Sequence, residues 1–152
     1  MAGRARGPVN PPPAFWDASA VVPLCVNEKH SASAGSFLRQ YRMVVWWGTS
    51  VEIAGALARL LRMSLLSHAE WLQAHRIASF FAREWTEVSP SDGLRTRAGQ
   101  VVGTYDLRAA DAFQLAAALE WSDGSPAGKI FLSADRRLLE AALLSGFDAL
   151  SL

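Results

Sequence analysis

Apolar residues along this chain alternate between short continuous runs and longer stretches in which they recur every three or four positions. Short runs rich in β-branched and aromatic residues are typical of strands covered on both faces. Such strands are predicted at residues 14–16, 43–47 and 130–133, with further short strands at 86–88 and 148–152.

Helical spacing fills the segments between these strands. Helices are predicted over residues 19–27, 30–41, 68–85, 108–121 and 136–144. Two more begin at caps, one after Thr49 or Ser50 and one within Ser89–Asp92 that runs to about Val102. Short strands that alternate with helices indicate an α/β fold of three layers, α/β/α, with a central, mostly parallel sheet.

The length and composition favour one folded domain behind a flexible leader. With 152 residues, the chain has room for one core of normal size. Residues 1–13 are rich in Gly, Arg and Pro and are expected to be a flexible leader, so the domain covers residues 14–152. No signal peptide or membrane-spanning run is evident, and Cys25 is the single cysteine, so we expect a cytoplasmic protein without disulfides.

Four acidic residues carry most of the functional information. Asp17 and Asp135 each follow a predicted strand, whereas Glu52 and Asp111 lie in the first turns of predicted helices. A lone buried carboxylate is costly, so it needs a metal ion, a partner or water. Ligands in sheets of this kind bind beyond the carboxyl ends of the strands, where Asp17 and Asp135 are expected.

Carboxylate ligands suit Mg²⁺ or Mn²⁺, and no His/Cys constellation typical of zinc is present. All four acids, Asp17, Glu52, Asp111 and Asp135, are therefore candidate metal ligands and catalytic residues. Hydroxyl side chains flank them in the sequence and are candidates for orienting ligands or water; these are Ser19, Thr49 and Ser133. The net charge of +1 gives no bulk signal for nucleic acid.

Each acid also has a local structural interpretation. Asp17 and Asp135 are each placed to cap the helix that follows. Glu52 has the spacing of a capping-box partner of Thr49, and Asp111 is favoured in a first helical turn by the helix dipole. Capping and metal binding are compatible, so both interpretations stay open for these residues.

Four segments resemble, in order and spacing, the successive motifs of PIN domains, and the nearest branch is the VapC-type toxins of bacterial toxin–antitoxin pairs. The segments are Phe15-Trp16-Asp17-Ala18-Ser19-Ala20, Val51-Glu52-Ile53, Leu107-Arg108-Ala109-Ala110-Asp111-Ala112-Phe113-Gln114-Leu115-Ala116 and Leu132-Ser133-Ala134-Asp135-Arg136-Arg137-Leu138. The resemblance runs from about Phe15 to the C-terminus. Many relatives have His where this chain has Gln114.

The resemblance implies a PIN-like nuclease domain over residues 14–152: a Mg²⁺- or Mn²⁺-dependent endoribonuclease that cleaves RNA, commonly dimeric and held inactive by a co-expressed antitoxin. It places the family's acidic positions at Asp17, Glu52, Asp111 and Asp135. Arg108 is a candidate contact for RNA phosphate, or alternatively an ion-pair partner of Asp111.

Two other classes compete with the nuclease. One is a non-catalytic PIN-like module that binds RNA or a protein; retention of all four acids argues against it. The other is a different α/β metal phosphohydrolase, but phosphatases with an aspartyl nucleophile typically have a second Asp two residues on, where this chain has Ser19.

Overall fold

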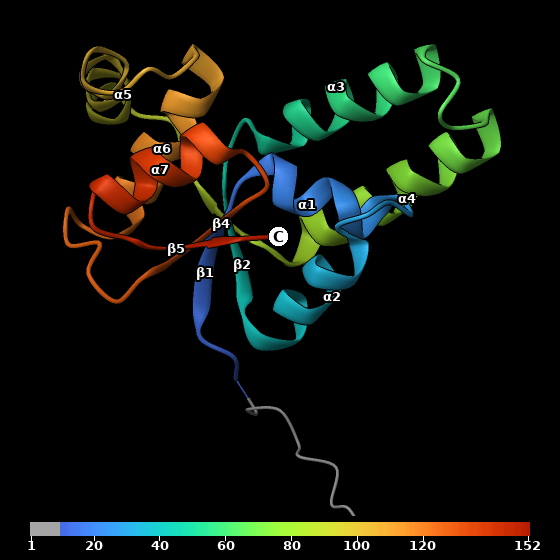
Figure 1. The fold of residues 1–152 in the computed structure, drawn as a ribbon, viewed down its shortest axis with the longest axis horizontal. Coiled ribbons are helices and arrows are strands. Elements are labelled where there is room, and N and C mark those ends of the chain that lie inside the picture. Colours follow the sequence, from blue (N-terminus) through green and yellow to red (C-terminus); the bar gives the residue numbers. More distant parts are fainter. Residues whose placement is uncertain (1–9) are drawn as a thin grey trace, which may run out of the picture.

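A five-stranded sheet forms the centre of the molecule in this computed structural model, which describes residues 10–152 (Figure 1). The strands are β1 (Pro13–Trp16), β2 (Arg42–Trp46), β3 (Thr86–Val88), β4 (Ile130–Ser133) and β5 (Asp148–Ser151). Their order is β3-β2-β1-β4-β5, and every pairing is parallel, so the sheet is wholly rather than mostly parallel.

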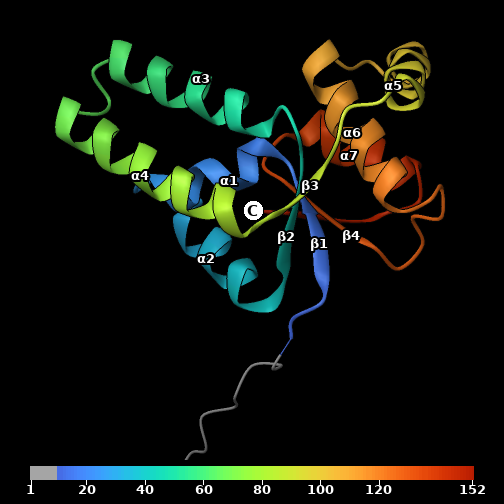
Figure 2. The same ribbon diagram turned by 180° about the vertical axis from the view of Figure 1, so that it is seen from behind.

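Seven helices of the described chain cover the two faces of this sheet. They are α1 (Ala18–Cys25), α2 (Ser31–Gln40), α3 (Thr49–Arg62), α4 (His68–Glu84), α5 (Asp92–Thr104), α6 (Ala109–Trp121) and α7 (Arg136–Leu144). Helices α1–α4 lie on one side of the strands and α5–α7 on the other, as Figures 1 and 2 show from opposite directions. The three-layer α/β/α architecture predicted from the sequence is confirmed.

The two helical layers follow from the direction in which the chain crosses the sheet. From β1 it moves to β2 and β3 at one edge, and then crosses back to β4 and β5 beyond the other side of β1. Crossovers between parallel strands are right-handed, so this reversal places the helices of the two halves on opposite faces. The strand order therefore reverses between β1 and β4, which is where a ligand crevice is expected in such a sheet.

Alternation along the strands divides the core between the two layers. Phe15 and Phe131, which are paired in register on β1 and β4, stack at 5.4 Å between ring centroids and pack with α5–α7. Trp16 and Leu132, one residue further along, are fully buried in the layer with α1, α3 and α4. Since successive side chains point to opposite faces, each strand contributes to both cores.

Cys25, the last residue of α1, is buried in the helical layer formed by α1–α4. Burial raises the pKa of its thiol to about 12. The thiol is therefore protonated at neutral pH and acts as a small core residue, not as a nucleophile.

Most predicted boundaries lie within two residues of those observed, and the differences are local. The predicted cap of α3 is wrong: α3 begins at Thr49 after Gly48, which has no side chain, and the Thr49 hydroxyl is turned into the protein interior. Part of the predicted leader is also ordered. Pro13 belongs to β1, and Arg42 donates hydrogen bonds to the carbonyl oxygens of Pro11 and Pro12 at 2.8 and 2.9 Å. Residues 1–9 of the leader lie outside the described part of the chain.

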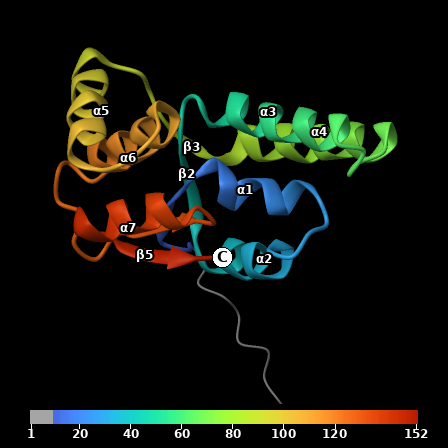
Figure 3. The same cartoon turned by 45° about the horizontal axis from the view of Figure 1, so that its top comes forward.

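Helices α3 and α4 pack as a hairpin that extends away from the sheet (Figure 3). A capping box starts α4, in which the Ser67 side chain accepts from the Glu70 backbone and Glu70 accepts from the Ser67 backbone. Along residues 10–152, none of the helices has both the length and the apolar character that crossing a bilayer requires.

Candidate functional site

Asp17 and Asp135 lie where the strand order reverses. Asp17 follows β1 directly, Asp135 follows the neighbouring β4 by two residues, and the Asp17 backbone N–H donates to the Leu132 carbonyl at 3.0 Å. Both acids also cap helices: Asp17 accepts from the Ser19 N–H at the start of α1, and Asp135 accepts from the Leu138 N–H at the start of α7. The capping interpretation of both residues is therefore confirmed. Each cap uses one carboxylate oxygen, Oδ2 of Asp17 and Oδ1 of Asp135, so the second oxygen of each residue is not needed for capping.

Two hydroxyls hold the Asp17 carboxylate, which is only 3% exposed. Ser19 Oγ and Ser133 Oγ both donate to Asp17 Oδ2, the latter at 2.9 Å, and the Ser19 N–H adds a third bond to the same oxygen at 3.2 Å. All three bonds end on Oδ2, so Oδ1 is the less engaged of the two carboxylate oxygens.

The two hydroxyls are themselves fixed by backbone donors of the segment after β4. Ser19 Oγ accepts from the Ala134 N–H and Ser133 Oγ accepts from the Asp135 N–H, each at 2.9 Å. Each serine therefore accepts from the backbone and donates to Asp17, and the two hydroxyl oxygens lie 3.1 Å apart. This network ties the start of α1 to the end of β4 and orients Asp17 between them.

Glu52, in the first turn of α3, does not form a capping box with Thr49, because Thr49 is already helical. Its partner is Gln114 of α6, a fully buried residue. Gln114 Nε2 donates to Glu52 Oε1 at 3.0 Å and to Thr49 Oγ1 at 3.1 Å. The sequence analysis noted Gln114 only as a departure from relatives, although an amide within a helix otherwise rich in Ala and Leu was a signal of a polar role.

Asp111 lies in the first turn of α6, as predicted, and Arg108 immediately precedes that helix. No ion pair joins Arg108 to Asp111 among the described residues. Burial raises the pKa of Asp111, and the positive charge of Arg108 offsets only a small part of that rise. Asp106 is almost fully exposed and contacts Arg137 at 3.6 Å, which makes it a surface residue and not a fifth member of the acidic group.

Electrostatic coupling shows that the acids face a common region. Burial, together with the charges of Asp17 and Asp111, raises the pKa of Glu52 from 4.5 to about 7. Burial, together with the charges of Asp135 and Asp17, raises the pKa of Asp111 from 3.8 to about 6. Burial also raises the pKa of Asp17, against the opposing effect of its hydrogen bonds to Ser19 and Ser133. Asp17 and Asp111 therefore repel Glu52, and Asp135 and Asp17 repel Asp111, which links acids from four parts of the chain.

The chemistry of this donor set fits a hard divalent cation. Carboxylate oxygens are the ligands that Mg²⁺ and Mn²⁺ prefer, and a cation would relieve the mutual repulsion of the acids. As the side chains are placed in residues 10–152, however, no three Asp, Glu, His or Cys residues lie close enough to hold one ion together.

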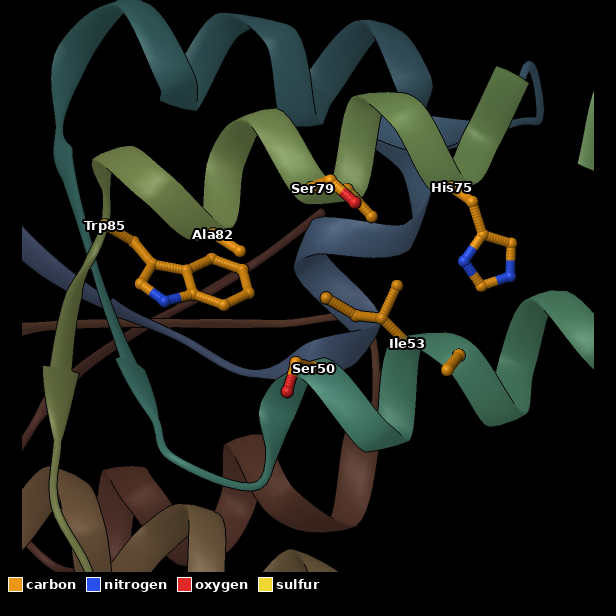
Figure 4. Close-up of a pocket in the computed structure, with 8 residues that line it drawn as sticks. Ser50, Ile53, His75, Ser79, Ala82 and Trp85 are labelled. Carbon is orange, nitrogen blue, oxygen red and sulfur yellow. The ribbon is translucent and has the colours of Figure 1, made fainter. Parts of the chain in front are cut away.

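A hollow lies away from the acids, between α3 and α4 (Figure 4). It has a volume of about 110 Å³, and its lining is Ser50, Ile53, Ala54, His75, Ala78, Ser79, Ala82 and Trp85. Ser50 and Ile53 flank Glu52 in the sequence, but helical geometry turns them to a different side of α3, and none of the four acids lines this hollow.

The paired tryptophans at the end of β2 differ in environment. Trp46 is buried and stacks in parallel on Phe113 at 5.5 Å between centroids, whereas Trp47 is 55% exposed. Trp16, at the end of β1, is fully buried.

No protein-family model and no curated protein matches the sequence. Similar solved structures exist. The crystal structure of PAE2754 from Pyrobaculum aerophilum matches with a TM-score of 0.64 at 20% identity, over 92% of this chain and 89% of that chain. The crystal structure of FitAcB from Neisseria gonorrhoeae matches with a TM-score of 0.60 at 15% identity, over 89% of this chain and 96% of that chain. The fold is PIN-like. At these identities the likeness establishes the PIN-like architecture alone, and the chemistry rests on this chain's own residues.

Proposed function

We propose that this protein is a metal-dependent endoribonuclease of the toxin type found in type II toxin–antitoxin pairs. The observation that carries the proposal is that Asp17 and Asp135 lie beyond the strand ends of a PIN-like sheet where strand order reverses, and that the charges of Glu52 and Asp111 are coupled to them. Such a group costs stability without a cation, so a folded domain that keeps it gains something else from it. The resemblance of the four sequence motifs to VapC-type toxins supports RNA as the substrate.

In the proposed site, the cation would be held by Asp17, Asp111 and Asp135, while Glu52 would ligate it or orient the attacking water. A bound Mg²⁺ or Mn²⁺ supplies an activated water and neutralises charge on the phosphate. The chain's own contribution is placement. Ser19 and Ser133 hold the Asp17 carboxylate by one oxygen, and burial of this group in the core keeps its other oxygen in a fixed direction.

The RNA backbone would contact the exposed Arg108, beside the first turn of α6 that carries Asp111. Its guanidinium suits phosphate oxygens, which it can bind through two parallel hydrogen bonds. A single-stranded loop is the proposed target, because its unstacked bases are accessible to a protein.

The proposal includes an antitoxin that binds and inhibits the protein, and a homodimer. Exposed large apolar side chains support protein–protein contacts, since they lie in groups on two parts of the surface. Met63 and Leu65 lie at the tip of the α3–α4 hairpin, and Leu143 and Leu144 lie at the end of α7.

A second candidate function is a non-catalytic PIN-like module that binds RNA or a protein. The observation that favours it is the spacing of the acids in residues 10–152, where no three side chains are placed to share one ion. The two candidates differ in metal binding, which the experiment below measures.

The deciding experiment compares the native protein with Asp17→Asn on a panel of structured RNAs, with Mg²⁺, Mn²⁺ or EDTA. We expect metal-dependent cleavage by the native protein and none by Asp17→Asn, with cooperative unfolding preserved. Asp148→Asn is the matched control, because Asp148 is exposed and begins β5. It therefore lies at the amino ends of the parallel strands, whereas Asp17 lies at their carboxyl ends. Cleavage retained by Asp17→Asn would contradict the assignment. A folded native protein that neither cuts RNA nor binds Mn²⁺ would favour the non-catalytic module.

A further inference from the structure

Gln114 is a polar residue at a buried position, where an apolar residue would pack at a lower cost in free energy. It is 0% exposed, and its neighbours on α6 include the buried Ala112, Leu115 and Ala116. Its Oε1 is buried and has no hydrogen-bond partner in the described chain. An unpaired buried amide oxygen is unfavourable, and methionine would fill a similar volume without that cost. Something other than packing must therefore favour the amide at this position.

The nitrogen of the same amide, Nε2, has a hydrogen-bond acceptor for each of its two hydrogens. Nε2 carries two hydrogens, and these go to Thr49 Oγ1 at 3.1 Å and to Glu52 Oε1 at 3.0 Å. The bond to Thr49, itself fully buried, fixes the plane of the amide. With that plane fixed, the second hydrogen has one direction, which is toward Glu52.

This contact also joins the two helical layers across the carboxyl edge of the sheet. Gln114 is three residues after Asp111, so both lie on one face of α6, while Glu52 comes from α3 in the opposite layer. The charges of Asp17 and Asp111 repel Glu52, and this repulsion favours rotamers that turn its carboxylate outward to solvent. The bond from Gln114 opposes that movement.

We propose that Gln114 is a positioning residue that holds the Glu52 carboxylate in the acidic site by one oxygen and leaves the other oxygen free for the cation or its water. The inference rests on the proposed metal-dependent function of that site. Gln114 itself touches neither metal nor substrate, and its effect passes through Glu52. Contacts of this kind, behind the residues that bind a metal, typically change metal affinity or activity by about 10–100-fold when removed.

The test measures Mn²⁺ affinity by calorimetry, along with urea unfolding of the metal-free protein, for the native chain and Gln114→Met. Methionine keeps the length and bulk of the side chain but removes both N–H donors. We expect Mn²⁺ binding to weaken by about tenfold or more in Gln114→Met. Thr49→Val frees the plane of the amide but leaves its bond to Glu52, so its Mn²⁺ affinity should fall by a smaller factor. Ser67→Ala, which breaks the capping box of α4 away from the acids, is the control for lost stability and should leave Mn²⁺ affinity unchanged.

The double variant distinguishes positioning from general support of the fold. If Gln114 acts through Glu52, then adding Gln114→Met to a Glu52→Gln background should cause no further loss of Mn²⁺ affinity. A purely structural role would instead lower affinity by the same factor in both backgrounds. If Gln114→Met does not fold, Gln114→Asn replaces it, because that amide is one methylene too short to reach both partners, and the same loss is expected.

The outcomes separate the two proposals. Native protein that binds Mn²⁺ and cuts RNA, together with Gln114→Met of unchanged affinity, would overturn the positioning role and leave the nuclease intact. Native protein that binds no Mn²⁺ would overturn both.

Discussion

Replacing Glu52 by Gln should stabilise the metal-free protein at neutral and alkaline pH. The substitution removes a charge from the acidic group but keeps a carbonyl oxygen that can accept from Gln114 Nε2. Burial and the charges of Asp17 and Asp111 raise the pKa of Glu52 from 4.5 to about 7. Ionising this carboxyl is thus harder in the folded protein than in the unfolded chain.

The sign of the pH dependence follows from proton counts. Between about pH 4.5 and 7 the folded state binds more protons at Glu52 than the unfolded state does, so the free energy of unfolding falls as pH rises through this window. The penalty is absent below the window and complete above it. A fully shielded group with this change of pKa would contribute about 3 kcal/mol, and partial exposure of Glu52 reduces that to roughly 1–2 kcal/mol.

Thermal melts in EDTA across this pH range measure the effect. For a domain of this size, we expect Glu52→Gln to melt about 3–6 °C above the native protein near pH 8, with the difference vanishing near pH 4. Mn²⁺ should then raise the melting temperature of the native protein more than that of Glu52→Gln. Parallel pH curves for the two proteins, or a less stable variant near pH 8, would refute the electrostatic reasoning.

Three further outcomes follow from the same geometry. Ser133→Ala removes a donor to the buried Asp17 carboxylate and should lower the free energy of unfolding by about 2 kcal/mol in urea, and it should weaken Mn²⁺ binding as well. Ser67→Ala breaks the capping box of α4, far along the hairpin, and should cost about 1 kcal/mol in urea without changing Mn²⁺ affinity. The pKa of Glu52 is raised to about 7 and that of Asp111 to about 6, so Mn²⁺ binding near pH 6.5 should release protons from these groups. The released protons would make the binding enthalpy measured by calorimetry depend on the ionisation enthalpy of the buffer. Equal binding enthalpies in all buffers would contradict this prediction.

The layer architecture was predictable because it depends on patterns that are local in the sequence. The apolar run at 130–133 and the helical spacing at 136–144 match β4 and α7 residue for residue. Strand order is not a local property, yet handedness and the single reversal between β1 and β4 constrain it strongly. One boundary moved for a tertiary reason. Thr49 or Ser50 was expected to cap α3, but Thr49 is already helical and its hydroxyl accepts from Gln114 of the other helical layer.

The sequence predicted where the four acidic residues lie relative to the strands and helices. It did not predict the hydrogen bonds that these residues make. Strand ends located Asp17 and Asp135, since the carboxyl ends of neighbouring parallel strands meet at one edge. Ser19 and Ser133 were singled out only because they are near acids in the sequence; that both bond to the same carboxylate oxygen depends on the pairing of β1 with β4. Gln114 could not be connected to Glu52 from sequence, because 62 residues separate them and the link crosses from one helical layer to the other.

The placement of the acids explains how one small domain can carry them. Asp17 is the most buried of the four, and it is also the one that receives two hydroxyls and a backbone N–H. Glu52 and Asp111 are only partly buried and have fewer bonds, so water still solvates part of each charge. Even so, burial outweighs the hydrogen bonds in setting the pKa of Asp17, which remains raised. The hydrogen bonds therefore compensate the burial of this carboxylate only in part, and under the proposed function a cation and protons would compete for it.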